Sequence, residues 1–338
     1  MSPSAGAVRQ SRRLQRLNAR GIVRTSVLVH DNARGSLDAI RPALMVPSLA
    51  EALAHAWRAF RDAAEPVNVS QVQHRSPFRY PGGKTWLVPE VRSWLSTHTV
   101  DRFVEPFAGG ASCGLMVAAE GSARVVLGEL DPYVSAVWNV IFVAPKKDAR
   151  WLCEQISGFR CTVKNVRDTL AVEPRTTRDL AWQTIVRNRC ARGGILAPGA
   201  GLNKSGEAGK GIASRWYPET LVQRITDLVE MRSNVDFVEC DAFDLLKKWA
   251  RRRRTAWFLD PPYTASAKSA GNRLYTAHTI DHVALFAAAA KCAGPVMMTY
   301  DDSPEVRKLA AKHRFAISTV PMKSTHHEVH RELILTKD

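Results

Sequence analysis

The residues of this chain best suited to chemistry stand at the end of a short apolar stretch. The stretch covers residues 255–259 and is followed by Asp260, Pro261, Pro262 and Tyr263. An apolar run of this length that stops at prolines is typical of a buried strand with a rigid turn after it. The sequence therefore predicts a carboxylate and an aromatic ring fixed at the tip of a strand. The alternative interpretation is a tight turn without a function.

Such a tip is suited to act on an exocyclic amino group of a nucleobase. The amino nitrogen is a weak nucleophile because its lone pair is delocalised into the ring. Hydrogen bonds from the amino hydrogens to the Asp260 side chain and the Pro261 carbonyl would localise that pair, and the Tyr263 ring would stack on a flipped base. Because the nitrogen becomes positive during methyl transfer, an anionic neighbour stabilises the transition state more than the ground state. We therefore regard residues 260–263 as candidate catalytic residues for direct methyl transfer.

A second group of residues has the spacing of a site for an adenosine-type cofactor. Residues 101–107 and 123–127 are predicted strands, and a glycine turn and the helix 113–120 lie between them. Gly109 would let the chain pass close under a ligand, and Glu129, about 20 residues later, would accept hydrogen bonds from both ribose hydroxyls. The full dinucleotide motif is not met, because an alanine holds the position of its second glycine, so a nicotinamide cofactor is not favoured. A glycine turn that serves packing alone remains the alternative.

Other residues would complete the same edge of a sheet. Asp241 follows the predicted strand 235–239, and its carboxylate could accept a hydrogen bond from an adenine amino group. The tips of parallel strands share one edge, where such folds bind their ligands. Upstream, the bare backbone of Gly82 and Gly83 could also approach a ligand closely. Phe78 stands where a phosphate loop needs its first glycine, so binding of a nucleoside triphosphate is not expected.

A loop rich in glycine and lysine interrupts the alternation of strand and helix. It covers residues 192–211 and lies among predicted helices at 151–171, 177–189 and 218–231. Long loops inside a compact domain are usually functional or disordered. We favour contact with a nucleic-acid backbone over a merely solvated loop. The cations expected to make this contact are Arg187, Arg189, Arg192, Lys204, Lys210 and Arg215.

The composition agrees with a polyanionic partner. The 338 residues include 48 Lys and Arg against 32 Asp and Glu, which gives a formal charge of +16. A ribosomal or membrane-surface protein would share this charge, although no apolar stretch reaches the roughly 20 residues of a membrane span. The six cysteines form no Cys-x-x-Cys pair, which suits reduced thiols in a cytosolic protein.

These patterns divide the chain into three parts. Residues 1–74 form a basic extension with a helical pattern at 48–64, and its first 30 residues hold six arginines and no acid. Such a start could be a basic arm on DNA, an organelle transit peptide or a non-structural upstream start. Residues 75–144 and 232–338 are expected to form an α/β catalytic domain, and residues 145–231 an inserted, mainly helical region.

Four motifs resemble, in order, those of the Dam-like adenine DNA methyltransferases of the alpha group. They lie at residues 78–84, 103–110, 128–131 and 260–263. The resemblance implies a Rossmann-like S-adenosylmethionine-dependent methyltransferase fold, with a mostly parallel sheet, an antiparallel edge strand and an inserted target-recognition region. It also implies double-stranded DNA as the partner, methylated at the 6-amino group of adenine after base flipping.

The cofactor implied by the resemblance is S-adenosyl-L-methionine. Tyr80 and Lys84 would lie near its methionine and adenosine parts, the glycine turn near its methionine end, Glu129 on the ribose and Asp241 near the adenine. The full set of implied cofactor residues is Tyr80, Lys84, Glu105, Pro106, Phe107, Ala108, Gly109, Gly110, Glu129, Asp241, Ala242, Phe243 and Asp260. The family implies a cytoplasmic protein of bacterial or phage origin. It leaves open the recognition sequence, the oligomeric state and a restriction endonuclease partner.

Several other functions share parts of this pattern. A cytosine 4-amino or RNA amino-methyltransferase would use the same tip, and a basic DNA-binding protein could keep the fold without catalysis. A ring-carbon cytosine methyltransferase needs a nucleophilic cysteine, typically after a proline, and no proline here precedes a cysteine. A metal site is not expected, because His327 and His330 are one residue short of helical zinc spacing and precede a predicted strand.

Overall fold

The chain divides into two compact units, Met1–Ala64 and Glu65–Asp338. The computed structural model describes residues 72–79, 83–196, 200–262, 280–323 and 329–338. The first unit, with the helical pattern at 48–64, therefore lies outside the described residues.

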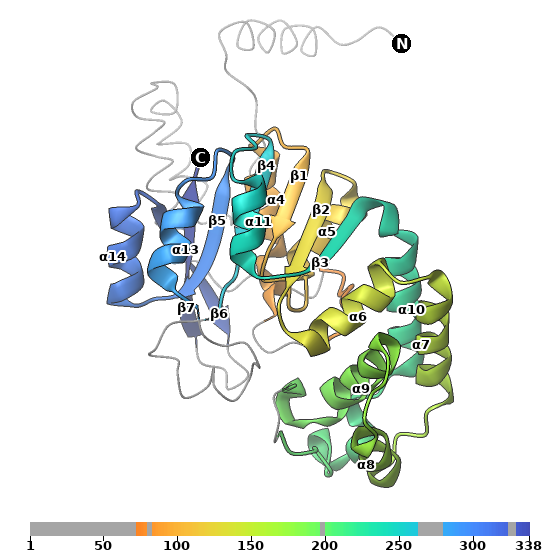
Figure 1. Ribbon diagram of the computed structural model, residues 1–338. Coiled ribbons are helices and arrows are strands. Elements are labelled where there is room, and N and C mark those ends of the chain that lie inside the picture. Colours follow the sequence, from red (N-terminus) through yellow and green to blue (C-terminus); the bar gives the residue numbers. More distant parts are fainter. Residues whose placement is uncertain (1–71, 80–82, 197–199, 263–279, 324–328) are drawn as a thin grey trace, which may run out of the picture. The chain divides into compact units, whose positions relative to one another are not determined.

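A seven-stranded sheet forms the centre of the described part of the second unit (Figure 1). The strands are β1 (Arg102–Glu105), β2 (Arg124–Glu129), β3 (Val235–Glu239), β4 (Thr255–Leu259), β5 (Val296–Asp301), β6 (Ala316–Lys323) and β7 (Val329–Lys337). Their order is β3-β2-β1-β4-β5-β7-β6. Strands β1 to β5 are parallel, whereas β7 runs antiparallel to β5 and β6. The expected α/β fold, a mostly parallel sheet with antiparallel pairing at one edge, is confirmed.

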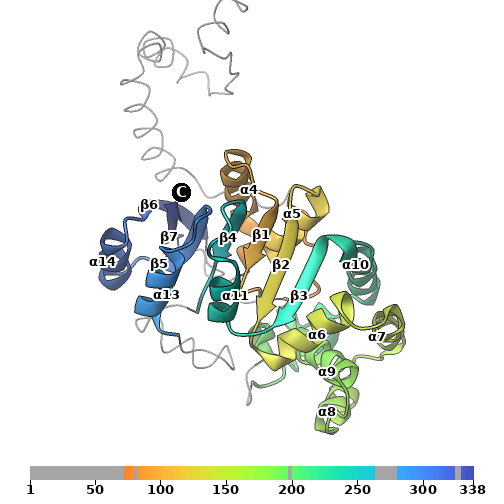
Figure 2. The same ribbon diagram turned by 45° about the horizontal axis from the view of Figure 1, so that its top comes forward.

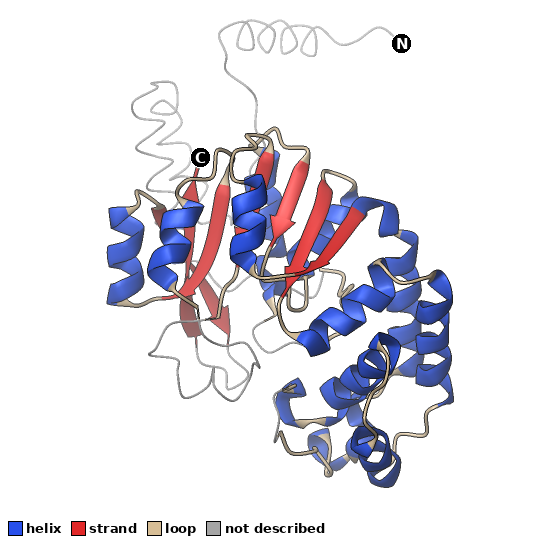
Figure 3. Cartoon of the chain, in the orientation of Figure 1, coloured by secondary structure: helices blue, strands red, loops and turns tan. Residues whose placement is uncertain are grey.

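Helices cover both faces of this sheet (Figure 3). One face carries α11 (Ala242–Trp249), α13 (His282–Ala289) and α14 (Pro304–Lys312), and the other carries α4 (Val88–Ser96) and α5 (Ser112–Glu120). Successive side chains of a strand point to opposite faces. In β4, Trp257 therefore packs in the core on the side of α11, α13 and α14, and Phe258 packs in the core on the side of α4 and α5. All residues of β4 are buried, as befits a central strand between two helical layers.

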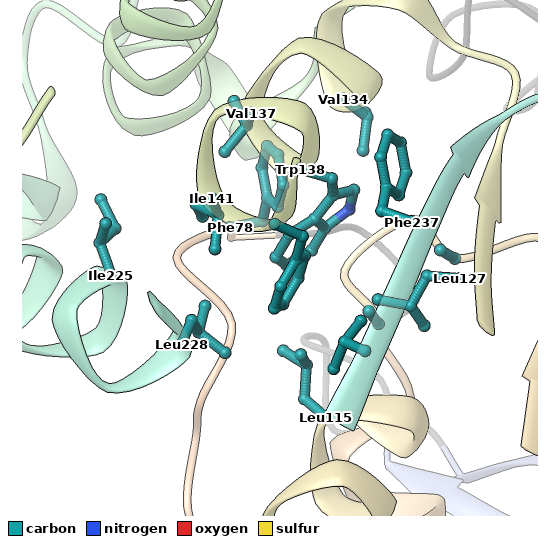
Figure 4. Close-up of a cluster of buried hydrophobic side chains, with 14 of the residues drawn as sticks. Phe78, Leu115, Leu127, Val134, Val137, Trp138, Ile141, Ile225, Leu228 and Phe237 are labelled. Carbon is teal, nitrogen blue, oxygen red and sulfur yellow. The ribbon is translucent and has the colours of Figure 1, made fainter. Parts of the chain in front are cut away.

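A helix that the sequence patterns did not reveal belongs to the core on the side of α4 and α5. It is α6 (Pro132–Phe142), and it begins at Asp131, whose side chain accepts hydrogen bonds from two backbone N–H groups of the first turn. Figure 4 shows Trp138 of this helix packed against Phe78, and the two ring centroids are 5.3 Å apart. Most residues of α6 are buried, so the helix lacks the polar face on which amphipathic periodicity depends.

Residues 145–231 form a helical region beside the sheet (Figure 2). Its helices are α7 (Lys146–Gly158), α8 (Val163–Ala171), α9 (Thr177–Cys190) and α10 (Pro218–Glu230). The single helix predicted at 151–171 is wrong, because α7 ends at Gly158 and the Thr162 side chain starts α8 by accepting the N–H of Asn165. Within the described residues, no helix is long and apolar enough to cross a membrane.

The described residues of the glycine-rich stretch between α9 and α10 include several short turns. They include η5 (Arg192–Gly194), η6 (Glu207–Gly209) and η7 (Ile212–Arg215). Ala191 and Leu202 pair as an isolated β-bridge at its start. At its end Trp216 is buried and packs edge-on against Trp182 of α9, with ring centroids 6.0 Å apart. The stretch is therefore paired with itself near its start and packed against α9 at its end.

Candidate active site at the carboxyl ends of the parallel strands

Four neighbouring parallel strands bring the predicted acids to one edge of the sheet. β1 ends at Glu105 and β2 at Glu129, while Asp241 follows β3 and Asp260 follows β4. β1 and β4 are neighbours although β2 and β3 lie between them in the sequence, so the winding of the sheet reverses at this point. Open α/β sheets bind ligands at such switch points. Glu105 and Asp260 flank the switch point of this sheet.

Asp260 is held through one of its two carboxylate oxygens. Its Oδ1 accepts a hydrogen bond of 2.7 Å from the hydroxyl of Thr299 on β5, and it lies 3.1 Å from Nζ of Lys84. The Asp260 side chain is 21% exposed. Both of these contacts with described residues are made by Oδ1 rather than by Oδ2.

Lys84 joins Asp260 to a third charged side chain. Lys84 begins η4 (Lys84–Leu87) and is buried, and its Nζ lies 3.0 Å from Oε1 of Glu332 in β7. Burial alone would lower the pKa of the ammonium, but the carboxylates of Asp260 and Glu332 together raise it, so Lys84 stays charged. The sequence placed Lys84 beside a cofactor, whereas the structure directs its ammonium to these two carboxylates.

Glu332 is a site residue that sequence reasoning missed. It is 2% exposed, and its Oε2 has no hydrogen-bond partner among the described residues. Burial is the main reason that the pKa of Glu332 rises to about 7, with Lys84 acting against this rise and Asp260 adding to it. The sequence did contain a signal, since Glu332 stands directly before the apolar residues of a predicted strand. An acid in such a place is buried only when it has a partner.

The glycine turn and Glu129 are in direct contact. The N–H of Gly109 donates to Oε2 of Glu129 at 2.8 Å, and Oε1 accepts from the N–H groups of Leu130 and Asp131 at 2.9 Å. Gly109 has a φ of 46°, in the left-handed region that favours glycine. Burial raises the pKa of the Glu129 carboxyl to about 7, against the effect of these hydrogen bonds. A carboxylate has about four acceptor positions, so Glu129 keeps capacity for a ligand hydroxyl.

Glu105 is buried next to the same turn. The N–H of Gly114 donates to its Oε2 at 2.7 Å. A Cβ at position 114 would lie only 2.5 Å from that oxygen, so this contact depends on glycine. Burial raises the pKa of Glu105 well above its ordinary range, and the carboxylates of Asp260 and Glu129 act in the same direction. The surroundings thus favour the protonated form of Glu105.

The other residues predicted to bind a cofactor line the same edge. Pro106, Ala108, Gly110 and Ala242 are buried, whereas Phe107 and Phe243 are half-buried. Asp241 is exposed and caps α11, because its Oδ1 accepts the N–H of Phe243 at 2.8 Å. After β4, Pro261 is buried and Pro262 is half-buried. Tyr80 and Tyr263 lie outside the described residues, so the roles assigned to them stay predictions.

Two residues of α9 hold the segment of the chain that precedes Lys84. Asn188 accepts the N–H of Arg79 at its Oδ1 and donates from Nδ2 to the Arg79 carbonyl, each at 2.8 Å. Arg189 donates to the carbonyl of Pro77 and is 8% exposed. Burial, together with repulsion from nearby arginines, lowers the pKa of Arg189 to about 10. The prediction that Arg189 contacts nucleic acid is therefore replaced by a structural role, because its guanidinium is buried against backbone.

The remaining predicted nucleic-acid cations differ in exposure. Arg187 is half-buried with its guanidinium 5.8 Å from the ring centroid of Tyr133, and Arg215 forms an ion pair with Glu207. Three are exposed on the turns between α9 and α10: Arg192, Lys204 and Lys210. These three are the best placed to meet a ligand in solution.

Comparison with known families bears on the part of the chain that builds this edge. Residues 80–159 match the family model of D12 class N6 adenine-specific DNA methyltransferases. The matched stretch contains Lys84, the glycine turn and Glu129. Over these residues, the match confirms the resemblance to adenine DNA methyltransferases. It supports a methyltransferase function for the chain. No curated protein sequence matches the chain.

Solved structures that resemble this fold include methyltransferases of low identity. One is a SAM dependent methyltransferase from Agrobacterium tumefaciens, with 8% identity, a TM-score of 0.34 and coverage of 75% of this chain and 60% of that one. Another is a precorrin-6y C5,15-methyltransferase from Geobacter metallireducens, with 11% identity, a TM-score of 0.33 and coverage of 74% and 86%. These values are too low to bear on function.

Proposed function

We propose that the chain is an S-adenosylmethionine-dependent DNA methyltransferase that methylates the 6-amino group of adenine, acting directly on a flipped base. The observation that carries the proposal is the Asp260 carboxylate at the switch point of the sheet. One of its oxygens is fixed by Thr299 and Lys84, and we assign the other to the target amino group. The family match over residues 80–159 supports adenine in DNA as the target.

The residues of the edge suit S-adenosylmethionine. Glu129 has an unused acceptor position beside the bare backbone of Gly109, which fits a ribose hydroxyl pressed against the turn. The exposed carboxylate of Asp241 fits an adenine amino group, because only one of its oxygens is needed to cap α11. When bound, this cofactor supplies an electrophilic methyl group. Burial favours the protonated form of Glu105, which reduces the negative charge behind the turn.

The chain's own residues would prepare the amino group of the target. Oδ2 of Asp260 accepts one amino hydrogen, and the carbonyl of Pro261 accepts the other, which draws the nitrogen lone pair out of the ring. As the nitrogen gains positive charge, the carboxylate stabilises it and then takes its excess proton. Lys84 and Thr299 contact Oδ1 and thereby fix the carboxylate, and in this proposal Oδ2 faces the target.

The helical region 145–231 would serve as the target-recognition region. It carries the exposed cations Arg192, Lys204 and Lys210, which suit DNA phosphates. Asn188 and Arg189 tie this region to the segment before Lys84. DNA held by the region would therefore lie close to the edge where the base must enter.

A methylation assay tests the proposal. Purified protein is incubated with labelled S-adenosylmethionine and either DNA of varied sequence or RNA, and the digested nucleosides are identified by mass spectrometry. N6-methyladenine in DNA is the expected product. 4-Methylcytosine or a methylated RNA base as the sole product would reassign the substrate, and the absence of any methylated base would refute the proposal.

A further inference from the structure

The geometry points to Glu332 as a positioning residue whose charge balances that of Lys84, so that Asp260 keeps a net negative charge toward its ligand. This inference rests on the proposed function, in which Asp260 receives the target amino group. Glu332 itself is buried in β7 and bonds Lys84 rather than Asp260. It would act through Lys84.

The cluster is assembled from parts of the chain that lie far apart. Lys84 starts η4, Asp260 follows β4, and Glu332 lies in β7. In the register of β5 and β7, Glu332 pairs with Asp301 and therefore shares its face of the sheet. Thr299, two residues before Asp301, shares that face and reaches Asp260. The fold thus gathers two carboxylates around one ammonium on a single face.

The charges explain why a second carboxylate is needed. At 3.1 Å, the ammonium of Lys84 offsets most of the field of the Asp260 carboxylate, and it does so strongly where water is excluded. Ionised Glu332, with its oxygen 3.0 Å from the same Nζ, returns the cluster to a net charge of −1. A net negative cluster stabilises the positive charge that develops on the amino nitrogen, whereas a neutral one does not.

Other ionisable groups surround the cluster. They are Glu105 at the end of β1, Cys113 on α5, and Tyr300 and Asp301 on β5, while β6 places Val320 opposite Glu332. Burial raises the pKa of Glu105, Cys113 and Tyr300, which favours their neutral forms. Glu332, with a pKa of about 7, can lose and gain its charge within the range where turnover is measured.

The test compares the pH dependence of kcat in three proteins at saturating DNA and cofactor. Above pH 7 we expect Glu332→Gln to have a kcat lower than wild type by about tenfold. The wild-type kcat should fall as the pH decreases through about 7, because Glu332 gains a proton, whereas the Gln variant should show no such fall. Glu332→Asp keeps the charge and should retain the fall. Cofactor affinity should stay within about twofold in both variants, since the Glu129 end of the site is unchanged.

Glu305→Gln on α14 is the matched control, because Glu305 is an exposed carboxylate outside the cluster. A Glu332→Gln variant with wild-type kcat at every pH would overturn the inference. So would a loss of kcat by the same factor at every pH, which is the result of a purely structural role. If wild-type protein methylates a base other than adenine, the proposed substrate fails while the same kcat comparison still decides the role of Glu332. If it methylates nothing, both fall.

A separate contact joins two cysteines of the helical region. The sulfur atoms of Cys161 and Cys190 lie 3.5 Å apart. Among the described residues, no other two cysteines share a hydrogen bond between their sulfur atoms. Cys161 is half-exposed in the link between α7 and α8, whereas Cys190 is buried at the end of α9. We infer that this pair is oxidised to a disulfide by a peroxide such as hydrogen peroxide.

Cys161, the more exposed of the two thiols, reacts with the peroxide first. The Cys161 thiolate attacks one peroxide oxygen, which forms an S–O bond, breaks the O–O bond and releases hydroxide. The Cys190 sulfur then attacks the Cys161 sulfur, the S–S bond forms, the S–O bond breaks, and the second hydroxide leaves with the Cys190 proton as water. Both sulfurs are oxidised and the peroxide is reduced. The neighbouring thiol also lowers the pKa of Cys161, which favours the first step.

Peptide mass spectrometry of the full chain after peroxide treatment tests this inference. The expected product is a Cys161–Cys190 cross-linked peptide that has lost two hydrogen atoms and is restored by dithiothreitol. Cys161→Ser should abolish the cross-link, and Cys153→Ser, which removes another half-exposed thiol, should not. Stable sulfinic acid at Cys161 without a cross-link, or equal oxidation of Cys153 and Cys240, would overturn it.

Discussion

The side-chain amide of Asn188 forms two hydrogen bonds with the backbone of Arg79, one in each direction and each 2.8 Å long. The same Nδ2 also donates to the carbonyl of Gly194 at 2.9 Å. The Asn188 side chain thus pairs with the backbone of Arg79 as a neighbouring strand would. Gly194 permits this approach, because a Cβ there would lie 2.5 Å from the Arg79 carbonyl oxygen.

Asn188→Ala should destabilise the protein by about 2 kcal/mol or more, because it leaves buried backbone groups without partners. Urea denaturation measures this loss. Asn165→Ala is the control, since the Asn165 side chain makes one exposed hydrogen bond to a backbone carbonyl, and its loss should cost well under about 1 kcal/mol. Equal stability of the two variants would show that the Asn188 clamp contributes little.

The sequence predicts the strand tips well, because each is marked locally. Asp260 follows an apolar run and precedes two prolines, and Glu129 stands at the spacing that a glycine turn requires. Both features depend on residues within about 20 positions of each other in the chain. The alternation of strand and helix predicts that most strands are parallel, as β1 to β5 are.

Contacts between distant residues could not be predicted in this way. The pair of Lys84 and Glu332 spans 248 positions, and the bond between Arg189 and the Pro77 carbonyl spans 112. No local pattern separates an arginine that will be buried from one that will face solvent. The helix α6 was missed for a related reason, since burial on all sides removes its polar face, although Asp131 before Pro132 is a recognisable start.

Asp260→Ala should reduce methyl transfer by about a thousandfold or more, because it removes the acceptor of the amino hydrogen and the charge that stabilises the transition state. Cofactor affinity, measured by calorimetry, should change only a few-fold. Asp236→Ala is the control. Asp236 forms an exposed ion pair with Arg124 at the amino ends of the strands, away from the site at their carboxyl ends. Near-normal turnover of the Asp260 variant would remove it from the catalytic residues.

Glu129→Gln should weaken cofactor binding before it affects turnover at saturation. The pKa of Glu129 is raised to about 7, so in wild-type protein the ionised acceptor is lost as the pH falls below that value. The dissociation constant of the cofactor should therefore rise between about pH 7 and pH 6 in wild type. The Gln variant should not show this rise. A parallel pH dependence in both proteins would assign it to another group.

The raised pKa of Glu332 also predicts a pH-dependent stability. In the folded state the pKa rises from 4.5 to about 7, so the folded protein holds a proton that the unfolded chain has released between these values. The contribution of Glu332 to stability is complete below about pH 4.5 and is lost as the pH rises to about 7. The difference in unfolding free energy between wild type and Glu332→Gln should shrink over this window by at most about 3 kcal/mol. Urea denaturation at several pH values measures it, and a difference that is constant with pH would contradict the shift.

The exposed cations between α9 and α10 should set the salt dependence of DNA binding. Replacement of Arg192, Lys204 and Lys210 by alanine should weaken binding to all DNA sequences alike. It should also reduce the slope of log K against log salt by about one for each phosphate contact removed. The control replaces three exposed lysines in and next to α13 and α14, which removes the same charge elsewhere: Lys291, Lys308 and Lys312. If both triple variants change the slope equally, the effect comes from net charge, and the turns between α9 and α10 are not the contact surface.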